Sequence, residues 1–127
     1  MSGIIRSYED LDVWNRAMDL AEMIGFLTKR LPVDERFALS DQMRRAAVSI
    51  PSNIAEGQCR GSTKDFIKYL YISKGSNAEL HTQLLLTVRM GYFTNDQISS
   101  AVSLCNRVGQ MLTSYIASLK LKENAQK

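Results

Sequence analysis

Long stretches of apolar residues at helical spacing, with few turn-forming residues between them, are the feature that most constrains the fold of this chain. Its 127 residues include only 2 Pro and 7 Gly. Toward the C-terminus, apolar residues recur at every third or fourth position and form one stripe: Ile98, Ala101, Val102, Cys105, Val108, Gly109, Leu112, Tyr115, Ile116 and Leu119. This spacing predicts an amphipathic α-helix with one buried face.

Start and stop signals divide the chain into four predicted helices: Tyr8–Leu31, Asp34–Arg60, Thr63–Met90 and Asn95–Lys120. Ser7, Ser62 and Thr94 precede three of them and are good N-terminal caps. Pro32 and Gly91 follow the first and third, where proline stops a helix and glycine adopts the left-handed conformation. Because connections this short force neighbouring helices to run antiparallel, we expect an all-α, antiparallel up-down four-helix bundle.

The length suits one domain, residues 1–127, with an ordered core over about residues 8–120. Pro51 lies inside the second predicted helix. Proline removes one backbone hydrogen bond and clashes with the preceding turn, so we expect this helix to be kinked near Ala47–Ile50. No stretch approaches the length of a membrane span, no secretory signal opens the chain, and the cysteines are too few for a disulfide framework. We therefore expect a cytoplasmic protein that contacts no membrane.

Positive charge is concentrated in the second part of the chain. Residues 1–43 contain 5 Lys or Arg against 8 Asp or Glu, whereas residues 44–127 contain 11 against 5. Such an excess suits a nucleic-acid or acidic partner, and it also suits an ordinary solvated surface. The residues that we expect to contact phosphates are Arg44, Arg45, Arg60, Lys64 and Lys68.

Polar side chains at helical spacing on the second and third helices predict a polar layer between them: Gln42, Arg45, Asn53, Glu56, Ser76 and Glu79. Because buried charges are tolerated only when paired, we expect an ion pair of Arg45 with Glu79 or Glu56. This layer is either a structural network that fixes the register of the helices or a ligand or catalytic site. The structural interpretation is favoured, because no nucleophile or titrating base joins the set.

Residues for metal or covalent chemistry are sparse. His81 is the only histidine, and Glu79 lies only two residues away, on another helical face, so neither a di-iron nor a zinc site is indicated. Neither Cys59 nor Cys105 has a histidine nearby in sequence, and the chain has no phosphate-binding loop motif. We expect no metal, no cofactor and no enzymatic activity.

The first predicted helix carries two apolar stripes. One contains Val13, Ala17, Leu20, Ile24, Leu27 and Leu31. The other contains Leu11, Trp14, Met18 and Ala21. One stripe is enough for the core of a bundle, so the second predicts contact with another subunit. The alternative is a helix that lies deep inside its own bundle.

A family resemblance is carried by the run QMRRAAVSIPSNIAEG, from Gln42 to Gly57. This run is similar to the signature of the four-helix-bundle proteins encoded in intervening sequences of bacterial 23S ribosomal RNA genes. Further matches extend the resemblance from about Tyr8 to Leu119, including DLDVW at Asp10–Trp14 and GYF at Gly91–Phe93. The resemblance implies a left-handed bundle that assembles as a ring, a homopentamer, and has no enzymatic activity.

The resemblance also implies kinship with the accessory proteins of diversity-generating retroelements. Those proteins are basic pentameric bundles that associate with a reverse transcriptase and with nucleic acid. Two residues depart from the resembled pattern: Asn77 stands where an apolar residue is expected, and His81 where an acidic one is. We expect the loss of the acid to make this face less negative and to alter a subunit contact.

These observations predict a non-catalytic, pentameric bundle that acts through its basic residues. Its expected partners are RNA, DNA, a ribonucleoprotein or a reverse-transcriptase-like protein. The alternative is a protein-interaction scaffold, which would use the second apolar stripe of the first helix and would not bind nucleic acid.

Overall fold

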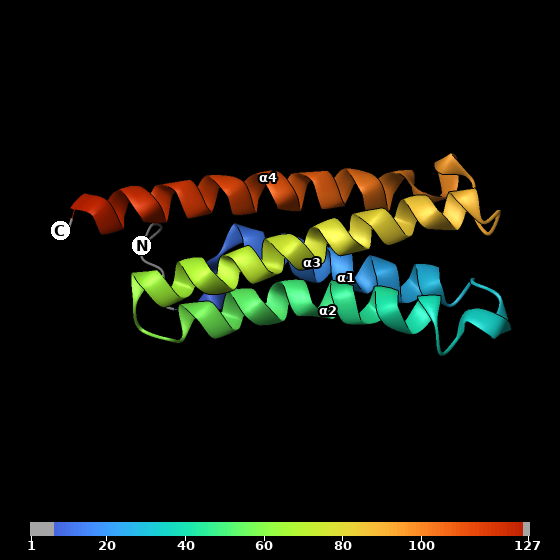
Figure 1. Cartoon of the computed structure of the whole chain (residues 1–127), viewed down its shortest axis with the longest axis horizontal. Helices are drawn as coiled ribbons and strands as arrows, with labels where there is room; N and C mark the ends of the chain where they lie inside the picture. Colours follow the sequence, from blue (N-terminus) through green and yellow to red (C-terminus); the bar gives the residue numbers. More distant parts are fainter. Residues whose placement is uncertain (1–6, 126–127) are drawn as a thin grey trace.

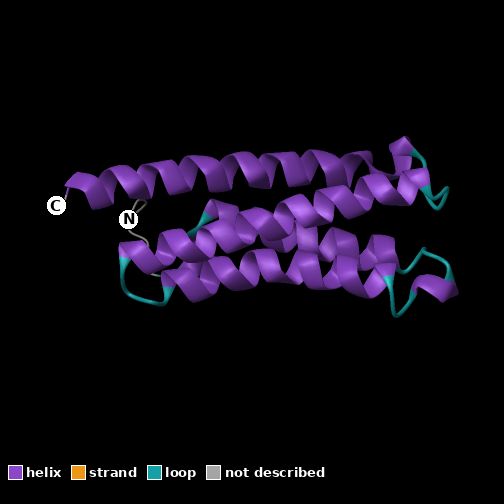
Figure 2. Ribbon diagram, in the orientation of Figure 1, coloured by secondary structure: helices purple, strands orange, loops and turns teal. Residues whose placement is uncertain are grey.

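The computed structural model describes residues 7–125, which form four helices (Figures 1 and 2). The helices are α1 (Asp12–Thr28), α2 (Leu39–Gln58), α3 (Thr63–Arg89) and α4 (Asn95–Ala125). Two single-turn 3-10 helices precede α1 and α2, namely η1 (Tyr8–Asp10) and η2 (Val33–Glu35). No residue in the described part of the chain is in a strand. The prediction of an all-α four-helix bundle is confirmed.

Each helix packs against two neighbours in the bundle. α2 lies between α1 and α3, and α4 packs against both α3 and α1. In Figure 1, α4, α3 and α2 lie one below the other, with α1 behind them. The α2–α3 turn and the C-terminal end of α4 lie at one end of the bundle, whereas the α1–α2 and α3–α4 connections lie at the other.

All four helices contribute to one apolar core. Its largest fully buried side chains include Leu20, Ile24, Met43, Ile50, Ile54, Leu70, Leu80, Leu84, Val108 and Leu112. Burial of each such side chain contributes about 1.5–3 kcal/mol relative to its exposed state. In α4 the buried residues Ile98, Ala101, Cys105, Val108, Leu112 and Ile116 all belong to the predicted apolar stripe, which is therefore confirmed as a core face.

The second apolar stripe of the first helix lies mostly inside the monomer. Leu11 is buried, and Trp14 and Ala21 are half-buried against the core. The Trp14 ring lies 5.3 Å from that of Tyr8, centroid to centroid. Only Met18, which is 44% exposed, faces solvent to a large extent. The stripe thus offers less apolar surface to another subunit than the sequence suggested.

The predicted N-terminal caps of α3 and α4 are present in the structure. The hydroxyl of Ser62 accepts a hydrogen bond from the Asp65 N–H, at 3.1 Å. The Thr94 hydroxyl accepts from the Gln97 N–H at 3.2 Å, and the Gln97 side chain accepts from the Thr94 N–H at 2.8 Å. Gly91, with φ of +78°, ends the α3 region in the left-handed conformation that favours glycine.

Three predicted helices prove shorter, the third by one residue only, and the fourth proves longer. Leu11 is extended (φ −86°, ψ 125°) and separates η1 from α1, which ends at Thr28. The second helix starts at Leu39, not Asp34, because η2 and a turn through Ala38 intervene. Leu11 and Leu31 are buried at these breaks, so the chain leaves helical geometry where their side chains enter the core. α4 continues past Lys120, since no glycine or proline follows to stop it.

α2 and α3 approach each other closely along their length. A Cβ atom built on Gly57 would lie 2.6 Å from Cβ of Tyr69 and 3.1 Å from Cδ1 of Phe66, so only glycine fits there. Farther along, the Ser73 hydroxyl donates to the Ile50 carbonyl at 2.8 Å. α2 continues through the buried Pro51. The kink expected there stays a prediction.

Candidate nucleic-acid interface

The five basic residues expected to contact phosphates separate into two groups. Arg44 and Arg45 lie near the start of α2, whereas Arg60 follows its end and Lys64 and Lys68 lie in the first turns of α3. Arg44 and Arg60 are 16 positions apart, which along a helix is roughly 24 Å at 1.5 Å per residue. The structure therefore does not bring the five together, and each group must be judged by its own surroundings.

Two cations of the group at the α2–α3 turn lie over an aromatic ring, and we call Arg60, Lys64, Lys68 and Tyr69 the turn cluster. The Arg60 guanidinium carbon lies 5.1 Å from the centroid of the Tyr69 ring, and the Lys68 ammonium lies 5.8 Å from it. Both distances are within cation–π range. Arg60 also pairs with Glu56, one turn earlier, at 3.3 Å. All three cations are exposed, so the turn cluster presents positive charge beside an aromatic face.

A second cation–aromatic pair comes from the end of α4. The Lys120 ammonium donates a hydrogen bond to the Tyr71 hydroxyl and lies 4.9 Å from the centroid of that ring. Lys122 lines a shallow groove together with Gly61, Ser62 and other residues of the α2–α3 turn. The predicted up-down topology already places the end of α4 beside the α2–α3 turn, but Lys120 and Lys122 were not among the candidate residues predicted from the sequence.

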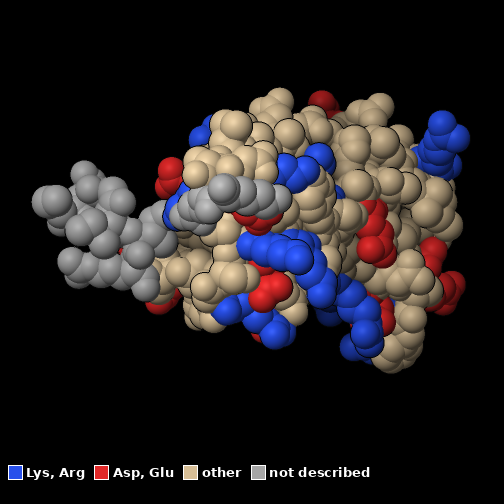
Figure 3. Space-filling view, turned by 60° about the vertical axis from the view of Figure 1, so that its left-hand side comes forward, with Lys and Arg blue, Asp and Glu red and all other residues tan. Residues whose placement is uncertain are grey.

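Carboxylates lie among these cations. Glu56 pairs with Arg60, and Asp65 occupies the first turn of α3. Figure 3 views the molecule with this end turned forward: Lys and Arg side chains gather in the lower half of the view, with Asp and Glu side chains among them. The surface is therefore a band of positive charge with acidic breaks, which suits a few phosphate contacts better than a continuous track.

Arg44 and Arg45 have different partners. The Arg44 Nε donates to the hydroxyl of Thr28 at 3.0 Å, which joins α2 to the end of α1. Arg45 points into solvent with its side chain 79% exposed and pairs with Asp41, one turn earlier, at 3.0 Å. An exposed pair of this kind contributes little to stability, about 0.3–0.5 kcal/mol.

The predicted polar layer forms only in part. Arg45 pairs with neither Glu79 nor Glu56, because its side chain is in solvent and Glu56 is taken by Arg60. Glu79 accepts a weak hydrogen bond from Gln83, at 3.4 Å, and Gln42 is exposed. These positions lie at the edge of the α2–α3 contact, where long charged side chains reach water. The expected ion pair was wrong.

Short side chains of the same set do meet across the helices. The hydroxyls of Ser49 and Ser76 lie 2.8 Å apart, and the Asn53 amide donates to the Ser49 carbonyl at 2.8 Å and to its hydroxyl at 2.9 Å. Ser49 and Asn53 are half-buried. This small network joins α2 to α3 and contains no charged group, so it acts as a register contact.

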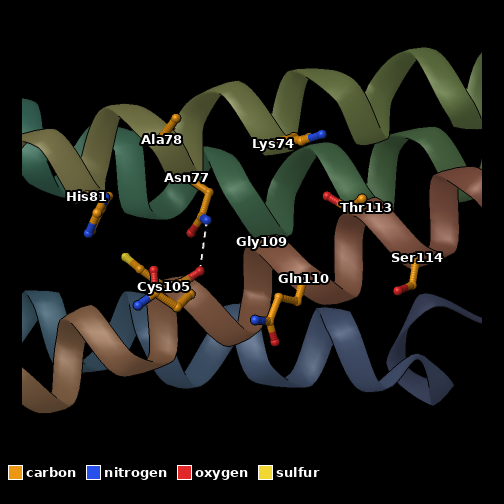
Figure 4. Close-up of a pocket in the computed structure, with 10 residues that line it drawn as sticks. Lys74, Asn77, Ala78, His81, Cys105, Gly109, Gln110, Thr113 and Ser114 are labelled. Atoms are coloured by element: carbon orange, nitrogen blue, oxygen red, sulfur yellow. Dashed lines mark hydrogen bonds between the residues drawn. The ribbon is translucent and has the colours of Figure 1, made fainter.

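A polar groove of about 590 Å³ lies between α3 and α4 (Figure 4). Asn77 forms part of its floor and donates to the Cys105 carbonyl at 2.9 Å, while its own carbonyl oxygen is buried without a partner among the described residues. His81, one turn along α3, also lines the groove and is half-buried. Both residues that depart from the resembled pattern thus lie at this one groove.

The two thiols differ in accessibility. Cys59 is exposed and Cys105 is buried in the core. Burial raises the pKa of the Cys105 thiol to about 12, so it stays protonated and is a poor nucleophile at neutral pH. Across residues 7–125, no group of three His, Cys, Asp or Glu side chains is placed to hold a metal ion. Within the same range, no helix is both long enough and apolar enough to span a bilayer.

Comparison with known proteins supplies a family. The family model described as 23S rRNA-intervening sequence protein matches residues 9–114. A crystal structure of a protein of unknown function, from the S23 ribosomal protein family of Bacteroides thetaiotaomicron VPI-5482, is similar with a TM-score of 0.77. The two sequences are 30% identical, and the match covers 83% of this chain and 95% of that one. None of the curated proteins matches the chain.

Proposed function

Since the chain belongs to the 23S rRNA-intervening sequence protein family, we propose that it is a non-catalytic, ring-forming bundle, a pentamer, that binds nucleic acid. The observation that supports this proposal is the turn cluster, in which the exposed cations Arg60 and Lys68 lie over the Tyr69 ring and the exposed Lys64 lies one turn before Lys68. Lys and Arg side chains bind phosphates, and an aromatic ring beside them can stack on an unpaired base. A cytoplasmic location is part of the same proposal, because nucleic acid is available there.

Self-association is part of the proposal because a ring would present one turn cluster per subunit. One copy offers only a few phosphate contacts, whereas a ring presents the same cluster repeatedly, and linked sites bind far more tightly than single ones. Exposed apolar side chains lie near the contact between Ser49 and Ser76. Val48, which is 57% exposed, precedes Ser49 in α2, and Ile72 lies one turn before Ser76 in α3. This outer face of α2 and α3 is the surface that we assign to the neighbouring subunit.

Other exposed apolar side chains favour a second candidate, a protein-interaction scaffold. Phe37 is 88% exposed in the α1–α2 connection, and Leu86 and Met90 are exposed near the end of α3. Exposed apolar side chains mark protein contacts where they are contiguous, and Leu86 and Met90 lie one turn apart. A scaffold would use them without needing the turn cluster, so the two candidates differ in the effect of charge reversal.

Nucleic-acid binding is tested by titrating the protein against a labelled structured RNA and a matched DNA duplex at about 50 and 200 mM salt. The test variant is Arg60→Glu/Lys64→Glu/Lys68→Glu. The control, Arg30→Glu/Arg89→Glu/Arg107→Glu, makes the same charge change on exposed residues that are not among the five expected phosphate contacts. Light scattering of all three proteins gives the oligomeric state at the same protomer concentration.

We expect the affinity of the wild type to fall steeply as the salt concentration rises. The test variant should bind at least tenfold more weakly, and its plot of log affinity against log salt should be less steep by about one unit for each lost phosphate contact. The control should stay within about threefold of the wild type. Equal losses in both variants would refute the turn cluster as the site. No binding at low salt would refute the nucleic-acid proposal and leave the scaffold.

A further inference from the structure

A cavity of about 340 Å³ lies at the opposite end of the bundle, where α1 connects to α2. Buried side chains of Thr28, Leu31 and Ser40 form its floor. Its exposed rim carries three cations, which we call the hairpin cations: Lys29, Arg36 and Arg44. The volume is at the lower end of the range for small-molecule sites, roughly 300–1,000 Å³.

The hairpin cations have no acidic partner among residues 7–125. The ion pairs in that range involve Arg16, Arg45 and Arg60 instead. Asp34 and Glu35 lie on η2 nearby, but neither lines the cavity, and Glu35 accepts a hydrogen bond from the Tyr92 hydroxyl. Three positive charges thus surround one small hollow without compensation, and an anion placed there would be attracted by all three.

One of the three cations is held in place by a hydrogen bond across the cavity wall. The bond from Arg44 Nε to the Thr28 hydroxyl fixes the guanidinium and leaves its two terminal nitrogens without a partner in the described chain. The Ser40 hydroxyl, in the first turn of α2, donates to the Thr28 carbonyl at 3.4 Å and ties the two sides of the cavity together, and no side chain caps that helix. The N-terminal end of α2 is partially positive and the C-terminal end of α1, which lines the same cavity, is partially negative, so the attraction for an anion comes from the three cations.

A simpler explanation is that the cations complement the negative C-terminal end of α1. Lys29 directly follows α1 and suits that role. The explanation does not extend to Arg44, whose hydrogen bond goes to a side-chain hydroxyl and not to a terminal carbonyl. It does not extend to Arg36 either, because Arg36 follows η2 and its guanidinium lies over the exposed Phe37 ring, 5.7 Å from the centroid, with no hydrogen bond to a carbonyl among residues 7–125.

We propose that this cavity binds the phosphate group of a small phosphorylated molecule. A phosphate monoester carries up to two negative charges and three acceptor oxygens, which match three cations better than a single carboxylate does. Guanidinium groups bind phosphate through paired hydrogen bonds, and two of the three cations are arginines. The site is separate from the turn cluster, which lies at the other end of α2, so either proposal can fail without the other.

Calorimetric titration tests the proposal with inorganic phosphate and adenosine 5′-monophosphate as probes, and with adenosine and acetate as controls. The test variants are Arg36→Gln and Arg44→Gln. The matched control is Arg45→Gln, which removes the same charge one residue away, on a side chain that does not line the cavity. Because the Arg36 side chain makes no hydrogen bond within residues 7–125, Arg36→Gln keeps the test decisive if Arg44→Gln unfolds the protein.

We expect both phosphates to bind saturably and each test variant to weaken binding about tenfold, the effect of losing one charged hydrogen bond. Arg45→Gln should bind like the wild type. Absence of saturable phosphate binding, or an equal loss in Arg45→Gln, would overturn the proposal. Preference for a 5′-phosphorylated RNA over its 5′-hydroxyl form, lost in Arg36→Gln without any binding of the free monophosphate, would also overturn it and assign the cavity to nucleic-acid ends.

Discussion

The close contact between α2 and α3 at Gly57 predicts that replacement of this glycine by alanine lowers the free energy of unfolding. In Gly57→Ala, the new methyl carbon would lie 2.6 Å from Cβ of Tyr69, whereas carbon atoms in favourable contact are about 3.5–4.0 Å apart. One of the two helices must therefore move by about 1 Å. Cβ of Tyr69 is fixed to the backbone of α3, so no side-chain rotation relieves the overlap.

Two opposing effects determine how much Gly57→Ala changes the free energy of unfolding. Overpacking of a tight contact costs about 1–3 kcal/mol, and a clash that can be relieved only by backbone movement belongs at the upper end. Replacement of glycine by alanine inside a helix contributes about 1 kcal/mol in the other direction. We expect a net loss of about 2 kcal/mol in the free energy of unfolding, or roughly 8 °C in Tm for a chain of this size.

Two other helical glycines serve as controls for the same substitution. Cβ atoms at Gly25 in α1 and Gly75 in α3 would meet nothing within 4 Å. Gly25→Ala and Gly75→Ala should therefore stabilise the protein, each by about 0.5–1 kcal/mol. Urea unfolding followed by circular dichroism, at one protomer concentration, measures all three variants. If Gly57→Ala were as stable as the wild type, the close packing of α2 on α3 would be refuted.

Three further predictions concern buried polar groups. Ser73→Ala should lower the free energy of unfolding by about 1 kcal/mol, because it removes the hydrogen bond to the Ile50 carbonyl, whereas Ser114→Ala, at an exposed position, should change it by less than about 0.5 kcal/mol. A thiol reagent followed by mass spectrometry should show modification of Cys59 in the native protein and of Cys105 only after unfolding, and rapid modification of both would contradict the core packing. Stability should fall as pH rises from about 9 toward 12, because the unfolded chain releases the Cys105 proton near the ordinary pKa of 9.0 while the folded chain keeps it; an equally steep alkaline slope in Cys105→Ala would count against this reasoning.

The helices could be predicted because their signals are local. The apolar period of α4 and the caps at Ser62 and Thr94 depend on residues a few positions apart, and the structure contains both. The breaks at Leu11 and in the α1–α2 connection depend on how buried side chains reach a core built by other helices. No local pattern in the sequence encodes that requirement, so the first two helices were predicted too long.

The candidate sites were harder to predict, for the same physical reason. The turn cluster was found in part, because Arg60, Lys64 and Lys68 are close in sequence. Arg36 was missed at the cavity, since it approaches Arg44 only when the chain between α1 and α2 folds back. In the polar layer, helical spacing predicted that Arg45 lies on the same face of α2 as Ser49 and Asn53. It did not predict that Arg45 lies at the solvent-exposed edge of this face, where it pairs with Asp41.

The contact between α1 and α4 has a consequence for synthesis of the protein. The other packed pairs, α1–α2, α2–α3 and α3–α4, join helices that are consecutive in the chain, so each can form as soon as its second helix has been made. The α1–α4 contact needs the whole chain, which a ribosome extends at about 5–20 residues per second. Until α4 has left the ribosome, the apolar faces of α1 and α3 that pack against α4 in the finished bundle are exposed to water; together they form an open apolar trough. We expect a nascent chain that ends before Asn95 to depend on chaperones to shield that trough.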